Sequence, residues 1–109
     1  MNHFINISDL SKNELRSIIN GAKKRKSERG EKPNSQPDSD QPIKGKTMIM
    51  LFAKPSTRTR ISFDLAIKQL GGSSIILNED EIHYGKGDET IKDTAKVLSQ
   101  YADILVLVE

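Results

Sequence analysis

Three short apolar segments constrain the fold of this 109-residue chain more than any other feature of its sequence. The segments are Thr47–Phe52 (TMIMLF), Ser73–Leu77 (SSIIL) and Ile104–Val108 (ILVLV). The first and third are continuous apolar runs, a pattern typical of a strand that is buried on both faces of a sheet. No segment of the chain is long and apolar enough to span a bilayer, so we expect these runs to be strands around one modest core.

Helical patterns separate the three expected strands. The first intervening helix is expected from about Thr57 to Leu70, and Gly71-Gly72 supplies its end. Its inner face is expected to hold Ile61, Leu65 and Ala66. The second helix opens in approximate capping-box form at Thr90-Ile91-Lys92-Asp93. Its inner face is expected to hold Ile91, Ala95, Leu98 and Ala102. Two successive strand–helix–strand units predict an α/β fold, a parallel sheet with right-handed crossovers and flanking helices.

A further helix is predicted near the N-terminal end. Ser11 and Glu14 have capping-box spacing, and the helix that they open should run to about Arg29 and stop at Gly30. One face of this helix carries Leu15, Ile18, Ile19 and Ala22. The segment Glu31–Pro42 (EKPNSQPDSDQP) holds three prolines and several turn-forming residues, so we expect an exposed loop there. A second polar loop is expected at 78–89.

Composition excludes several classes of protein. The chain has 17 Lys and Arg against 15 Asp and Glu, and its net charge of +2 is not the lopsided charge of a general nucleic-acid-binding domain. It has no cysteine, which excludes disulfide frameworks and thiolate metal sites. The N-terminus lacks the apolar core of a signal peptide, so we expect a cytoplasmic protein with no membrane partner.

A basic run at Lys23–Lys26, extended by Arg29 and Lys32, raises the alternative of a nucleic-acid contact. No aromatic residue is interleaved with these cations, and Glu28 and Glu31 interrupt them. Cations near the C-terminus of a helix are also favoured by the helix dipole. We therefore expect a solvated helix end and no nucleic-acid partner.

Hydroxyl and guanidinium groups cluster between the first expected strand and the helix that follows it. The segment Phe52–Phe63 (FAKPSTRTRISF) places Ser56, Thr57, Arg58 and Thr59 directly after the strand. Ligands of open parallel sheets bind at the carboxyl ends of strands, where the unpaired amides and dipole of a helix start favour an anion. The hydroxyls add neutral donors and Arg58 adds a planar fork that suits phosphate oxygens. The alternative is that Ser56 merely caps the helix and the arginines point into water.

The same residues carry a resemblance to a known family. FAKPSTRTR is similar to the F-x-K-x-S-T-R-T-R signature of the carbamoyltransferases. The similarity extends through HFINISDLS, PIKGKTMIMLF, ISFDLAIKQLGG and GDETIKDTAKVLSQYAD, and so covers nearly the whole chain. Residues 1–109 thus resemble the N-terminal portion of the carbamoyl-phosphate-binding domain in the two-domain aspartate/ornithine carbamoyltransferase family. The resemblance implies an incomplete domain, with the ornithine-binding domain absent from this chain.

This resemblance implies an enzyme that transfers the carbamoyl group of carbamoyl phosphate to the δ-amino group of L-ornithine, giving L-citrulline and phosphate in arginine biosynthesis. Lys54 favours ornithine as the acceptor, because aspartate carbamoyltransferases usually have glutamate at this position. The family's carbamoyl-phosphate ligands carry over to Ser56, Thr57, Arg58 and Thr59. Arg58 is the implied catalytic residue, since it would reach both the phosphate and the carbonyl oxygen that gains negative charge.

Further expectations concern chemistry and assembly. No metal ion, cofactor or covalent nucleophile is needed for this transfer, in keeping with the absence of cysteine and the presence of only two histidines. Arg60 is expected to brace the loop or a neighbouring subunit rather than to touch substrate. The family implies a homo-oligomer, in particular a homotrimer.

Two positions depart from the family pattern. Where the family usually has glutamine before the third helix, this chain has His83 and one apparent extra residue, Asp88. His83 is expected to donate one hydrogen bond to carbamoyl phosphate, and a surface-loop histidine is the alternative. The family's phosphate-binding arginine aligns with Val108, whose apolar side chain cannot replace that charge.

The remaining motifs of the family, His-Pro-x-Gln and those of the ornithine-binding domain, would follow Glu109. We therefore expect the 109-residue chain alone to be inactive. Two alternatives stay open at this point. One is an aspartate carbamoyltransferase of pyrimidine biosynthesis, and the other is a truncated, non-catalytic carbamoyltransferase-like protein that binds a partner subunit.

Overall fold

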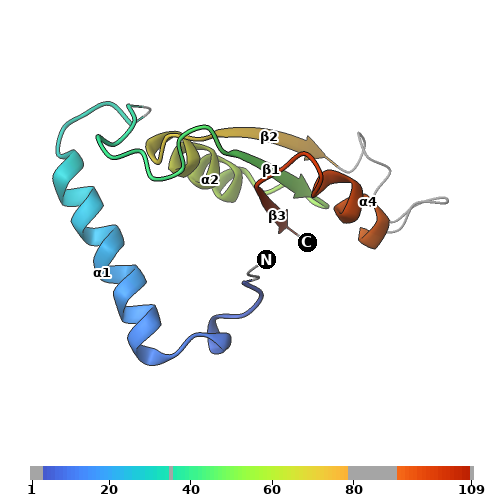
Figure 1. Cartoon of the computed structure of the whole chain (residues 1–109), viewed down its shortest axis with the longest axis horizontal. Coiled ribbons are helices and arrows are strands. Elements are labelled where there is room, and N and C mark those ends of the chain that lie inside the picture. The colour runs from blue at the N-terminus through green and yellow to red at the C-terminus, as the bar shows by residue number, and fades with distance from the viewer. Residues whose placement is uncertain (1–3, 35, 79–90, 109) are drawn as a thin grey trace. The chain divides into compact units, whose positions relative to one another are not determined.

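The computed structural model describes residues 4–34, 36–78 and 91–108 (Figure 1). The chain forms two compact units, Met1–Lys32 and Pro33–Glu109, and each is described here by itself. Its elements, in chain order, are η1 (Ile7–Asp9), α1 (Lys12–Arg29), β1 (Thr47–Phe52), α2 (Thr57–Gln69), β2 (Ser73–Asn78), α4 (Ile91–Leu98) and β3 (Ile104–Val108). None of the helices in these described ranges is long and apolar enough to cross a membrane.

The first unit contains α1 and the short 3₁₀ helix η1, which the sequence patterns did not predict. The expected capping box opens α1. The Ser11 hydroxyl accepts a hydrogen bond from the Glu14 amide at 3.1 Å, and the Glu14 carboxylate accepts one from the Ser11 amide at 3.0 Å. The bond from the Ser11 amide is the largest cause of a lowered pKa of Glu14. Gly30, with φ of 54°, ends the helix where predicted, because glycine adopts positive φ without a steric penalty.

The apolar face of α1 is not buried within the described part of the chain. Ile18 and Ile19 are 58% and 46% exposed, and no described residue of α1 is classed as buried. The helix is therefore held by its caps and its local backbone bonds rather than by a packed face.

The second unit is built on a parallel three-stranded sheet with the order β2-β1-β3. Met50 of β1 lies opposite Ile76 of β2 and Val106 of β3, and both pairings are parallel. Figure 1 shows α2 alongside β1 and β2. The predicted α/β fold with a parallel sheet is thereby confirmed. Because the chain passes from β1 to β2 on one side and then to β3 on the other, β1 lies where the strand order reverses.

The central strand β1 is buried on both faces, as its apolar run predicts. Alternate residues of a strand point to opposite faces, and Met48, Met50 and Phe52 form a core cluster with Ile67 of α2. Ile49 and Leu51 point to the other face, where they are only 3% and 1% exposed. Partly buried side chains pack around the cluster: Ile43, Ile76, Val106 and Val108.

Two predictions about burial were wrong. Ile61 was expected on the inner face of α2 but is 52% exposed, and Ile67 is the buried residue of that helix. Six positions separate these residues, which places them about 120° apart around the helix axis, so they do not share a face. The third strand was expected to be buried, yet Ile104 and Leu107 are 36% and 43% exposed. The reason is that β3 is an edge strand of the described sheet.

The third helix is shorter than predicted. It ends at Leu98, and Ala102 follows it in a turn that leads to β3. Thr94, in the middle of α4, is buried at 4% exposure, although the pattern did not place it inside. Asp103 then ties the start of β3 to β1, because its carboxylate accepts a hydrogen bond from the Thr47 amide at 2.9 Å.

The turn after α2 confirms the expected role of its glycine pair. Gly71 has φ of 97°, a conformation that residues with a side chain rarely adopt, and a Cβ there would lie 2.7 Å from the Cβ of Gln41. A Cβ on Gly72 would lie 3.0 Å from the Lys46 carbonyl oxygen. The two glycines let the chain leave α2 and enter β2 beside the loop that precedes β1.

We expect Met50→Ala to lower the free energy of unfolding by about 2–5 kcal/mol, because Met50 is fully buried and its loss leaves a cavity in the core cluster. Ile61→Ala is the matched control at an exposed apolar position and should cost less than about 1 kcal/mol. Urea unfolding of the parent chain and both variants measures the two effects. Equal destabilisation by both variants would contradict the observed core.

Candidate anion-binding site

An open pocket of about 350 Å³ lies at the carboxyl end of β1, where the chain turns into α2. This β1–α2 pocket is lined by Phe52, Ala53, Lys54, Pro55, Ser56, Thr57, Arg60 and Asn78. Seven of these residues lie between the last residue of β1 and the first turn of α2, including the segment that connects them. The eighth, Asn78, is the last residue of β2. The pocket therefore occupies the position in a parallel sheet where ligands commonly bind.

Ser56 occupies the N-cap position of α2 but does not cap the helix with its side chain. Its hydroxyl makes no capping hydrogen bond to the first turn, whereas the Ser11 hydroxyl caps α1. The backbone of Ser56, with φ of −154° and ψ of 80°, differs from that of Ser11, with φ of −69° and ψ of 161°. The simple capping alternative is wrong for Ser56, and its hydroxyl can serve the pocket that it lines.

The backbone at the start of α2 offers further donors. The first amide bonded back into the helix is that of Arg60, which donates to the Ser56 carbonyl at 3.0 Å. The geometry of an α-helix therefore leaves the amides of Thr57, Arg58 and Thr59 without partners inside the helix. These amides and the positive end of the helix dipole favour an anion at this position.

Among the residues that the structure describes, two cationic side chains and no acidic one line the pocket. Lys54 and Arg60 contribute a formal charge of +2, and the other lining residues are apolar or neutral polar. Both cations have exposed side chains. Lys54 and Arg60 therefore contribute positive charge to the pocket, and the chemistry that fits these two side chains is a small anion with several oxygen acceptors.

The structure brings some of the predicted site residues together and leaves others aside. Ser56 and Thr57 line the pocket, whereas Arg58 and Thr59 lie on the same first turn of α2 but outside the lining. His83 lies outside the described residues. The polar lining residues that sequence reasoning did not assign to the pocket are Lys54, Arg60 and Asn78. Helical spacing carried a signal for Arg60, because positions four apart share a helix face and Ser56 is four residues before it.

Val108, which the resemblance aligns with a phosphate-binding arginine, packs against the core. Its side chain packs against the cluster of Met48, Met50, Phe52 and Ile67, and its carbonyl accepts a hydrogen bond from the Ala53 amide at 2.9 Å. Val108 thus supports the end of β1 beside the pocket, but it offers the pocket no charge.

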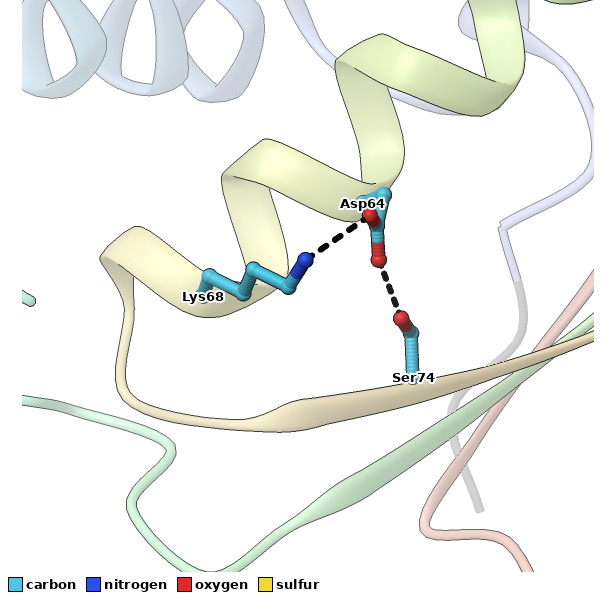
Figure 2. A network of polar contacts seen from close by, with 3 residues as sticks. All are labelled: Asp64, Lys68 and Ser74. Carbon is cyan, nitrogen blue, oxygen red and sulfur yellow. Dashed lines mark hydrogen bonds and ion pairs between the residues drawn. The ribbon is translucent and has the colours of Figure 1, made fainter. Parts of the chain in front are cut away.

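A polar network fastens α2 to the sheet behind the pocket (Figure 2). One oxygen of Asp64 accepts a hydrogen bond from Lys68 Nζ at 3.0 Å, and the other accepts one from the hydroxyl of Ser74 on β2. The pKa of Asp64 is lowered, chiefly by the Ser74 hydroxyl and then by Lys68, with a smaller effect of the nearby charge of Arg60. The network links the middle of α2 to β2 and so fixes the direction in which α2 leaves the pocket.

The described residues offer no cluster of metal ligands. Among residues 4–34, 36–78 and 91–108, no group of three or more histidine, aspartate or glutamate side chains could hold a metal ion. The donors that line the pocket are hydroxyl, amide and cationic groups, which suit an anion instead.

The fold and the pocket together define a class, that of α/β proteins with a pocket at the carboxyl edge of a parallel sheet. The family described as aspartate/ornithine carbamoyltransferase, carbamoyl-P binding domain, matches residues 2–108. The chain belongs to this family, as the resemblance of its STRTR segment predicts.

Known members resemble the chain closely over a third of their length. The ornithine carbamoyltransferase of Paracoccus denitrificans is 43% identical over 107 residues, which are 98% of this chain and 34% of that relative. The solved ornithine carbamoyltransferase from Pyrococcus furiosus has a TM-score of 0.79 at 37% identity, over 94% of this chain and 31% of that one. The catalytic subunit of M. jannaschii aspartate transcarbamoylase has a TM-score of 0.79 at 34% identity, over 98% of this chain and 33% of that one. The chain therefore spans about a third of the length of its curated relatives.

We expect Asp64→Asn to lower the free energy of unfolding by about 1 kcal/mol at pH 7, because the neutral amide weakens the bonds from Lys68 and Ser74. The folded-state pKa of Asp64 lies below its ordinary value of 3.8, so this stability is present above that pH. It is lost as the pH falls through the folded-state pKa. Urea unfolding from neutral pH to about pH 3 should therefore show the parent and variant converging.

Glu28→Gln is the control for this experiment, because Glu28 is an exposed carboxylate on α1. Its effect on the free energy of unfolding should stay near zero throughout the titration. A difference between Asp64→Asn and the parent that stays constant down to acid pH would contradict the electrostatic part of this account.

Proposed function

We propose that this chain is the carbamoyl-phosphate-binding part of an ornithine carbamoyltransferase, which transfers a carbamoyl group from carbamoyl phosphate to L-ornithine. The observation that carries the proposal is the β1–α2 pocket, where the STRTR segment opens α2 among cations and unpaired amides. Membership of the family supports the substrate class. Because the chain spans about a third of its relatives, we propose that it is a portion of one domain and that the rest of the enzyme holds ornithine.

The proposed roles at the site follow from the charges that develop during the transfer. Ser56, Thr57 and Thr59 donate hydrogen bonds to the phosphate oxygens together with the amides of the first turn. Arg58 is the proposed catalytic residue. As the amine attacks, the carbonyl oxygen gains negative charge and the phosphate begins to leave, and a guanidinium placed between them stabilises both. His83 is proposed as one further donor to carbamoyl phosphate.

The acceptor proposed for the reaction is ornithine. Lys54 supports this choice, because it stands where aspartate-specific members of the family usually have glutamate, and it lines the pocket. Curated relatives that are 43%, 44% and 47% identical to this chain are ornithine carbamoyltransferases, which also supports ornithine. Aspartate is the second candidate, since the solved M. jannaschii aspartate transcarbamoylase subunit is as close in fold as the ornithine enzyme of P. furiosus.

We further propose a cytoplasmic homotrimer, with no metal or cofactor in the reaction. The exposure of Ile104 and Leu107 on the edge strand β3 supports a larger assembly around the sheet, because apolar edge strands are normally covered. The alternative is a non-catalytic protein that uses the same surfaces to dock on a carbamoyltransferase subunit.

We expect the 109-residue chain to bind carbamoyl phosphate weakly, with a Kd of about 1 mM, because water and salt compete at an open site. Titration followed by amide NMR should shift the resonances of Ser56–Arg60. Arg58→Ala should weaken this binding strongly, and Arg16→Ala, which removes an exposed guanidinium from α1, should leave it unchanged. Shifts that gather at Lys23–Lys26 instead would overturn the proposed site.

We expect the protein expressed from its complete reading frame to form citrulline from carbamoyl phosphate and ornithine, and to ignore aspartate. The assay offers both acceptors to the same enzyme and measures citrulline and carbamoyl-aspartate separately. Carbamoyl-aspartate as the main product would show that the acceptor is aspartate and not ornithine. Absence of product with either acceptor would favour the non-catalytic alternative.

A further inference from the structure

The guanidinium of Arg60 belongs to the β1–α2 pocket by its place on the helix. Arg60 lines the pocket and Arg58 does not. The two residues are two positions apart on α2, so their side chains leave the helix about 200° apart. Arg60 instead shares a side of α2 with Asp64, which is four positions on and bonds to β2. The sheet-facing side of α2 is therefore the side from which Arg60 reaches the end of β1.

The neighbouring carboxylate of Asp64 makes no hydrogen bond to the guanidinium of Arg60. Asp64 lies one turn after Arg60, but its two oxygens accept hydrogen bonds from Lys68 and Ser74 (Figure 2). The order of charges explains this choice, because an acid that precedes its base by four positions pairs better on a helix than an acid that follows it. Asp64 therefore pairs with Lys68, and the guanidinium of Arg60 keeps its hydrogen-bond donors available to a ligand in the pocket.

We infer that Arg60 is a binding residue for the phosphate group of the pocket's ligand, acting from the sheet side of α2 together with Lys54. This inference rests on the proposed function, which assigns a phosphate-bearing ligand to the same pocket. It differs from the sequence-based expectation that Arg60 only braces a loop or a neighbouring subunit. A planar guanidinium bonds two phosphate oxygens at once, and Lys54 adds a second positive charge across the pocket.

The test is a titration of the 109-residue chain with inorganic phosphate, followed by the amide resonances of Ser56–Arg60. Arg60→Gln removes the charge but keeps a long polar side chain, and we expect it to raise the Kd about tenfold. Arg60→Lys keeps the charge without the planar fork and should fall between the parent and Arg60→Gln. Arg16→Gln, the same substitution on the exposed surface of α1, should match the parent.

A salt series separates binding from a merely structural role. In about 1 M NaCl the screening length falls to about 3 Å, so the gap in Kd between the parent and Arg60→Gln should shrink. The midpoint of urea unfolding is measured for each variant. If Arg60→Gln does not fold, the Kd of Arg60→Lys is compared with that of the parent instead. Either variant binding phosphate as tightly as the parent would overturn the role of Arg60 alone. A parent chain that shows no shift at Ser56–Arg60 would overturn the proposed anion site, and this inference with it.

Discussion

Burial of β1 on both faces is the constraint on which the rest of the second unit depends. Met50 and Leu51 are almost completely removed from water, one on each face, and this requires a strand on either side and cover above and below. The chain meets the requirement by placing β2 and β3 on opposite flanks of β1. The same reversal of strand order opens the carboxyl end of β1 to solvent. The core therefore determines where a ligand can approach the sheet.

The helix that begins at this opening is oriented by a network that lies outside the pocket. The Asp64 carboxylate holds Lys68 on its own helix and Ser74 on β2, so it fixes α2 against the sheet from its middle. Both hydrogen bonds of Asp64 go to Lys68 and Ser74, so its contribution to Arg60 is limited to the smaller effect of their charges on each other. Stability of the helix and availability of its first-turn donors are thus supplied by different residues. Asp64 therefore holds α2 on β2 without a hydrogen bond to Lys54 or Arg60, the two described cations that line the pocket.

Most of the fold could be predicted because it is encoded locally. The apolar run of β1, the capping box at Ser11 and the glycine pair after α2 each act within a few residues, and each was found in its predicted place. What could not be predicted depends on neighbours distant in sequence. The edge position of β3 follows from strand order, and the face of α2 that is buried follows from its packing on the sheet; the periodicity of one segment contains neither. The same holds for the pocket, because Asn78 reaches it only through the pairing of β2 with β1.

The positions of the side chains of the STRTR segment depend on both the local helix and its packing on distant residues. As a sequence it offers two arginines at alternate positions, and nothing in that alternation distinguishes one from the other. On a helix the two point to nearly opposite sides, and only the packing of α2 on β2 decides which side faces the strand end. A phosphate carries oxygens in several directions, so groups that approach the axis of a helix start from both sides can act on one ligand together. In the proposed site, the helix thus turns an alternating pair of arginines into two distinct sources of charge around one anion.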